Sequence, residues 1–209
     1  MKRRYKHVPV ILILALLLWR SCHFERLDKA REQAERKTFS PAEYARDFWD
    51  NKLTKNLDQA VDAQTLLELL NTDIGQAREK YGRTLGISSV CCFLLSGQGT
   101  VISMNQDGVF VSIRAPWSDP DIIIATSYIF GNAIRDASGL VDASQFPNSR
   151  DFNNISEQIN KIVATHVIPP FLENVDKGTT VRFVGAAEVS EDEPEIHPLY
   201  VIPISLEIE

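Results

Sequence analysis

The 209-residue chain has few of the residues from which catalytic and metal sites are built. It holds 3 Cys and 4 His, which form neither a CxxC pair nor an HExxH segment, so the usual zinc and thiol redox patterns are excluded. It also has no serine nucleophile elbow and no calcium loop of alternating oxygen ligands. The stretch 96–99 lacks the lysine of a phosphate-binding loop and is expected to be a turn. We therefore predict that the protein is not an enzyme and has no catalytic residue, metal ion or cofactor.

The chain also lacks an apolar run of the roughly 20 residues that a membrane-spanning helix needs. Residues 8–19 form an unbroken apolar run of 12, which has the length of a signal-peptide core, and it ends just before Ser21 and Cys22. Four basic residues precede it: Lys2, Arg3, Arg4 and Lys6. Because basic residues stay on the cytoplasmic side of a membrane, residues 1–22 predict a signal peptide or membrane anchor, with the rest of the chain outside.

Cys22 is the candidate lipidation site, because a bacterial lipoprotein signal closes on a cysteine that carries the lipid. Ser21 is small, as the signal peptidase requires, but Trp19 and Arg20 are bulky and charged where small residues are expected. Two alternatives remain: an uncleaved signal anchor, and a conventional cut after Ser21. Each of them places the protein in the bacterial cell envelope, and we expect an inner-membrane anchor with the domain in the periplasm.

Basic residues are scarce in the exported part. The chain carries 22 Lys and Arg against 28 Asp and Glu, a net charge of −6. Five of the basic residues and none of the acidic ones lie in residues 1–22, so the remainder carries 17 minus 28, or −11. An acidic body without a basic groove repels nucleic acid, so we expect no nucleic-acid partner. The membrane is the expected partner of the N-terminal segment.

The remaining cysteines, Cys91 and Cys92, are adjacent. Neighbours on a strand point to opposite faces, so a disulfide between them would need a strained turn. We expect both to be small core or half-buried residues.

Helical patterns fill the sequence up to residue 86. Residues 23–39 are charged and predict a solvated helical stalk. Residues 40–86 predict a helical collar, with one helix starting at Ser40-Pro41 and others over 62–70 and 73–81. An apolar stripe on the first helix would pack on the domain. Its members are Tyr44, Phe48, Trp49, Leu53 and Leu57.

Short β-rich runs dominate residues 87–209. A helix over 151–166, ended by Pro169-Pro170, interrupts them. Three or four strands, a helix and two strands are the order of a Greek-key barrel of the OB type, so the predicted class is α+β. An open antiparallel sandwich is the alternative. The predicted strands are 87–95, 99–105, 109–115, 121–126, 179–189 and 199–208, with a hairpin turn at 105–108.

Four stretches carry a resemblance to a known family. They are Gly-Asn-Ala-Ile-Arg-Asp-Ala at 131–137, Asp-Phe-Asn-Asn at 151–154, Phe-Trp-Asp at 48–50 and Val-Arg-Phe-Val-Gly at 181–185. In order and spacing the chain resembles a family of predicted periplasmic lipoproteins of unknown function, often encoded beside sugar ABC transporters. The resemblance implies an OB-like domain, a membrane-attached envelope location and no established catalytic activity.

The candidate ligand-binding residues lie in two of these stretches. Arg135 offers a planar fork of donors suited to a carboxylate or to sugar hydroxyls, and Asp136 can accept in turn. On a strand the two would face opposite ways, which leaves a structural ion pair as the alternative. Asn153 and Asn154, with Asp151, are expected as helix caps or as ligand contacts. The candidate set is Asn132, Arg135, Asp136, Asn153 and Asn154.

Two functions fit these observations. The first is a non-enzymatic, membrane-tethered accessory of a sugar ABC transport system, with the permease or a sugar-binding protein as partner. The second is a free-standing envelope domain that binds a small molecule or glycan.

Overall fold

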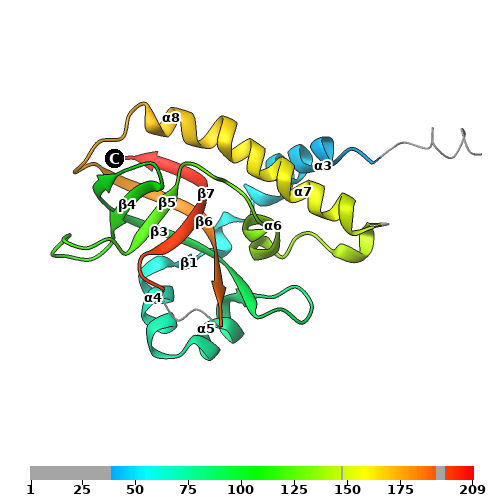
Figure 1. Cartoon of the computed structure of the whole chain (residues 1–209), viewed down its shortest axis with the longest axis horizontal. Coiled ribbons are helices and arrows are strands. Elements are labelled where there is room, and N and C mark those ends of the chain that lie inside the picture. Colours follow the sequence, from blue (N-terminus) through cyan, green and yellow to red (C-terminus); the bar gives the residue numbers. More distant parts are fainter. Residues whose placement is uncertain (1–38, 147, 192–195) are drawn as a thin grey trace, which may run out of the picture. The chain divides into compact units, whose positions relative to one another are not determined.

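The computed structural model describes residues 39–146, 148–191 and 196–209 (Figure 1). Residues 40–209 form one compact unit, so the predicted collar and the predicted barrel belong together. The predicted signal or anchor (1–22), Cys22 and all of the predicted stalk except Phe39 lie outside the described residues. Within the described ranges, no helix has the length and apolar character needed to cross a membrane.

Five strands close into a barrel. They run in the order β3-β4-β5-β7-β6, and β6 pairs back with β3. Only β5 and β7 are parallel in this ring; the other pairs are antiparallel. The predicted OB-like α+β barrel is therefore confirmed, and the open sandwich is excluded. The strands are β3 (Val90–Met104), β4 (Gly108–Ser112), β5 (Ile122–Ala125), β6 (Thr180–Ser190) and β7 (Leu199–Ile208).

The predicted turn at residues 96–99 is wrong, because β3 runs straight through it. β6 pairs with β3 without a break from Val90 to Thr100. Glycine is needed at two of these positions for close approach: a Cβ on Gly97 would lie 2.7 Å from the Phe183 ring, and one on Gly99 would clash with the Ser112 carbonyl oxygen. Two short strands, β1 (Val61–Asp62) and β2 (Gly82–Arg83), pair with the first half of β3.

The predicted hairpin between β3 and β4 is confirmed. The Asn105 backbone N–H donates to the Gly108 carbonyl at 3.1 Å. The Asn105 side-chain oxygen accepts from the Asp107 N–H at 2.7 Å, which is the usual use of asparagine in a turn.

Helices α4 (Ala63–Thr72) and α5 (Ile74–Tyr81) lie on the side of the barrel away from α7 (Figure 1). Asp62 and Asp73 cap them, each accepting from a backbone N–H three residues on. The buried α4 leucines Leu66, Leu67 and Leu70 join the core inside the barrel, together with Phe171. Helices α4 and α5 thus contribute side chains to the barrel core.

Helix α3 (Pro41–Phe48) starts where the sequence predicts, since the Ser40 hydroxyl accepts from the Glu43 N–H at 3.3 Å and Pro41 takes the first position. A π-helical turn, η1 (Trp49–Leu53), continues it, and a 3-10 turn, η2 (Leu57–Gln59), follows. Phe48 of α3 and Leu53 of η1 are buried. Helix α3 lies alongside α7 (Figure 1).

The long helix after β5 differs from the prediction at both ends. It runs as α7 (Ser149–Ile162), a π-helical turn η4 (Val163–Val167) and α8 (Ile168–Leu172). Its cap is Asn148, whose side chain accepts from the Asp151 N–H at 2.9 Å, so the caps predicted at 151, 153 and 154 are wrong. Pro169-Pro170 does not stop it, because the prolines occupy the first turn of α8, where a missing N–H costs little.

Candidate functional site

Arg135 and Asp136 lie on a helix, so they do not face opposite ways as neighbours on a strand would. The helix is α6 (Ala133–Ser138), and it ends at Gly139 in the left-handed conformation that glycine favours. A 3-10 turn, η3 (Ala143–Gln145), then leads towards α7. The helix packs on β3 and β6 and against α7, so it connects the barrel wall with the long helix.

The Arg135 side chain is 1% exposed and binds partners on both helices. Its Nε donates to Asp136 Oδ1 at 2.7 Å and its Nη2 to Asp136 Oδ2 at 3.1 Å. Its Nη1 donates to the Phe152 carbonyl at 3.0 Å, and the guanidinium carbon lies 3.6 Å from the centroid of the Phe152 ring. A buried charge needs such compensation, and the geometry favours the structural ion pair over the ligand clamp.

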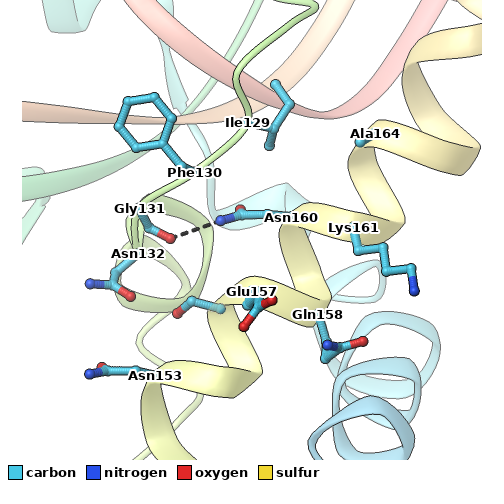
Figure 2. Close-up of a pocket in the computed structure, with 11 residues that line it drawn as sticks. Ile129, Phe130, Gly131, Asn132, Asn153, Glu157, Gln158, Asn160, Lys161 and Ala164 are labelled. Carbon is cyan, nitrogen blue, oxygen red and sulfur yellow. Dashed lines mark hydrogen bonds between the residues drawn. The ribbon is translucent and has the colours of Figure 1, made fainter. Parts of the chain in front are cut away.

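A cavity of about 620 Å³ lies between α7 and the segment that leads into α6 (Figure 2). Two of the predicted site residues, Asn132 and Asn153, line it. Arg135, Asp136 and Asn154 are not among the described residues of its wall. Its volume is within the range of small-molecule sites. The wall is formed by Ile129, Phe130, Gly131, Asn132, Asn153, Ser156, Glu157, Gln158, Asn160, Lys161 and Ala164.

Hydrogen bonds hold the segment opposite α7 in place. Asn160 reaches from α7 and donates from Nδ2 to the Gly131 carbonyl at 2.9 Å (Figure 2). Glu188 on β6 accepts from the Asn132 N–H at 3.2 Å, and the Tyr200 hydroxyl on β7 donates to the Ser127 carbonyl at 3.3 Å. Three elements far apart in sequence therefore fix one wall of the cavity before any ligand arrives.

Two aromatic rings project from this fixed segment. Phe130 is 72% exposed and Tyr128 is 79% exposed. Tyr128 also has a φ of 55°, which a bulky residue rarely adopts. The ring of Phe130 extends away from α7 at the edge of the cavity (Figure 2). Strain and exposure together are typical of binding surfaces.

The cavity wall is partly polar and partly apolar, and it carries no net charge. Glu157 and Lys161 supply one charge of each sign, and side-chain amides from Asn132, Asn153 and Gln158 supply donors and acceptors. The buried Ser156 hydroxyl has no hydrogen-bond partner among the residues that the structure describes. A buried polar atom of this kind is costly and requires an explanation.

Sequence reasoning missed most of this wall, although a signal was present. The polar residues at 153, 156, 157, 160 and 161 recur at helical spacing on α7. They share the helix with an apolar stripe that includes the buried Ile155 and Ile159. A polar face usually meets solvent, and only the tertiary fold places another segment opposite it.

The cysteines have no role in this site. Cys91 and Cys92 are both buried and free, as predicted from the sequence. Burial, and secondarily the nearby Glu188 and Asp136 carboxylates, raise the pKa of Cys92 to about 12, so its thiol stays protonated. In the part of the chain that the structure describes, no three His, Cys, Asp or Glu side chains gather to hold a metal ion.

Comparison with known proteins places the chain in a family. No curated protein matches it. A solved structure does: an OB-fold protein from Thermotoga maritima is similar at 30% identity and a TM-score of 0.76, over 83% of this chain and all of that one. The family model described as "Predicted periplasmic lipoprotein (DUF2291)" matches residues 12–207, which supports an envelope location. The chain thus belongs to this family of predicted periplasmic lipoproteins.

Proposed function

We propose that the protein is a non-enzymatic envelope protein, held at the inner membrane by its N-terminal segment, that binds a small neutral polyhydroxylated solute. The observation that carries the proposal is the amide-lined cavity between α7 and residues 129–132. Hydroxyl groups both donate and accept hydrogen bonds, and so do the Asn and Gln amides of the wall. The exposed Phe130 ring at the cavity edge offers a flat apolar surface to the C–H face of a sugar ring.

The role that best fits such a domain is accessory to a sugar ABC transport system. The resemblance of residues 48–50, 131–137, 151–154 and 181–185 to proteins encoded beside such transporters motivates it. Membrane attachment would raise the local concentration of the domain near the permease or its sugar-binding protein, so a weak interface would suffice. Deleting the gene should reduce uptake of at least one sugar, and a tagged chain should recover a transporter component. Unchanged uptake of every sugar tested, with no component recovered, would refute this role.

The ligand itself is tested with matched variants. Thermal unfolding of the full chain should shift upward with at least one sugar or cell-wall glycan in a panel. Asn153→Ala should abolish the shift because Asn153 lines the cavity. Asn154→Ala is the matched control, since it changes the same residue type one position along the same helix outside the wall, and it should keep the shift.

A free-standing binding domain, independent of any transporter, is the second candidate. The same cavity favours it, and it predicts a ligand-dependent thermal shift without any loss of sugar uptake on deletion. If neither Asn153→Ala nor Phe130→Ala weakens a ligand-dependent shift, the cavity is not the binding site.

A further inference from the structure

A second, smaller cavity lies where α5, β2 and η2 meet the C-terminal end of α6. Its volume is about 120 Å³. Lys80 and Arg83 supply its charged groups, and no carboxylate is present among the described residues that line it. Val61, Leu94 and Ala137 supply an apolar part of the wall. The cavity is thus a cationic site in a chain whose net charge is −6.

Lys80 and Arg83 each contact a neighbouring residue that does not neutralise their positive charge. The Lys80 ammonium lies 4.8 Å from the centroid of the Tyr81 ring, a cation–π contact. The Arg83 guanidinium lies flat against Gly139: a Cβ on this glycine would be 2.7 Å from each of the Arg83 atoms Cζ, Nε and Nη1. Lys80 and Arg83 are both exposed to solvent, so the contact with Gly139 restrains one face of the guanidinium and leaves the rest accessible. A backbone pairing of Arg83 with Cys92 fixes its strand.

Neither cation is paired with a carboxylate in the described part of the chain. Asp136 lines an adjoining cavity together with Arg83, but both of its oxygens bind the Arg135 guanidinium. Each of the other three ion pairs in the described residues uses a different arginine: Arg78, Arg114 or Arg182. Lys80 and Arg83 are therefore available to a ligand.

Stabilisation of helix ends does not account for this arrangement. α5 ends at Tyr81 and α6 ends at Ser138, and cations near such ends are favourable. Each end carries only about half a negative charge, and the Arg78 and Asp136 carbonyls there already accept backbone N–H groups. The two helix ends together offset at most about one of the two positive charges, so a positive charge remains in excess around a cavity that is itself partly apolar.

We propose that this cavity binds a small organic carboxylate. The Arg83 fork suits the two oxygens of a carboxylate, the Lys80 ammonium adds a second charge-assisted bond, and Val61, Leu94 and Ala137 accommodate a short hydrocarbon part. A bare phosphate would leave that apolar wall without a partner. The site is separate from the amide-lined cavity and stands without the function proposed above.

The test is thermal unfolding of the full chain with sodium butyrate, with sodium chloride at equal ionic strength and n-butanol as references. We expect a saturable upward shift with butyrate alone. Arg83→Gln and Lys80→Gln should each weaken the apparent affinity about tenfold or more, because each removes a charge-assisted hydrogen bond. Arg182→Gln is the matched control: it removes one positive charge from an exposed surface pair and should keep the butyrate response.

The unfolding temperature of each variant without ligand reports whether it folds. If Arg83→Gln does not fold, Lys80→Gln still decides the test. Three results would each overturn the proposal. They are no shift with butyrate, a butyrate shift in Arg83→Gln and Lys80→Gln equal to that of the unaltered chain, and a larger shift with phosphate than with butyrate. Asn153→Ala should keep the butyrate response, so failure here and failure of the amide-lined cavity are distinguishable.

Discussion

Removing the Asp136 carboxylate should destabilise the protein far more than removing a surface carboxylate. Asp136 accepts two hydrogen bonds from Arg135, whose side chain is 1% exposed and has no other carboxylate partner among the described residues. Breaking one side of a buried ion pair costs about 3–5 kcal/mol, because it leaves an uncompensated charge inside the protein. For a unit of this size, each kcal/mol lowers the unfolding temperature by about 2–4 °C, so Asp136→Ala should lower it by about 6–20 °C.

The free energy of unfolding can be measured by urea denaturation, followed by far-UV circular dichroism. Glu209→Ala is the control, because Glu209 pairs with Arg182 across an exposed surface, with side chains 40% and 57% exposed. Pairs of this kind contribute at most about 1 kcal/mol. The double variant Arg135→Met/Asp136→Ala should be more stable than Asp136→Ala alone, since it removes the buried charge itself.

The reasoning is refuted if Asp136→Ala costs no more than Glu209→Ala. It is also refuted if the double variant is less stable than the single one, because burial of the unpaired Arg135 charge would then not be the cause. A large loss in Asp136→Ala that the methionine at position 135 partly restores is the result we expect.

Three further predictions concern other parts of the barrel. Gly97→Ala should lower the free energy of unfolding by about 1–3 kcal/mol, because its Cβ would lie 2.7 Å from the Phe183 ring. Gly75→Ala on α5 is the control and should cost less in the same urea assay, because its Cβ would lie 3.3 Å from Asp73 Oδ1, at the end of a side chain; equal losses at both sites would contradict this. Burial disfavours the Asp121 carboxylate, but hydrogen bonds from Arg114, the Ile113 N–H and Ser112 outweigh it and hold the pKa of Asp121 below its usual value. The ionised Asp121 therefore adds its full contribution to the free energy of unfolding above the unfolded-state pKa of about 3.9, and this contribution is lost as the pH falls through the lower folded-state pKa. The loss of unfolding free energy caused by Asp121→Asn should therefore shrink in acid. A loss that stays constant down to pH 2 would contradict this. Titration with a thiol reagent at neutral pH should leave Cys91 and Cys92 unmodified in the native protein and modify both in urea. The reason is that both are buried and that the pKa of Cys92 is raised to about 12. Modification of either cysteine in the native state would show that the barrel wall opens.

Local signals in the sequence predicted most element boundaries. Ser40 with Pro41, and Asp62 and Asp73, begin helices in the structure because a short polar side chain can satisfy an N-terminal backbone N–H using only neighbouring residues. The hairpin at Asn105 was predictable for the same reason, since its hydrogen bonds span three residues. The order of strands and helices then sufficed for the OB-type barrel.

The same local signals failed where distant contacts override them. Glycines at 97 and 99 suggest a turn, but they occur in β3 because Phe183 and the Ser112 carbonyl approach too closely for a side chain. Pro169-Pro170 suggests a stop, but a preceding π-helical turn places both prolines where no N–H is needed. Residues 131–137 lie outside every predicted helix and strand, although residues 133–138 form α6, which packs against β3, β6 and α7.

The sequence alone determined the kind of protein: an acidic body after a basic and apolar N-terminal segment, no catalytic motif, and an OB-type succession of elements. These properties depend on composition and on contacts between near neighbours. Only the tertiary structure decided which polar residues meet. It buried Arg135 in an ion pair and placed Asn132 opposite α7 across a cavity. It also brought Lys80 and Arg83 together at a cavity whose described wall holds no carboxylate. Asp136 neighbours Arg135 on α6, but the other residues that meet at these places come from separate elements, and no local pattern specifies which elements pack together.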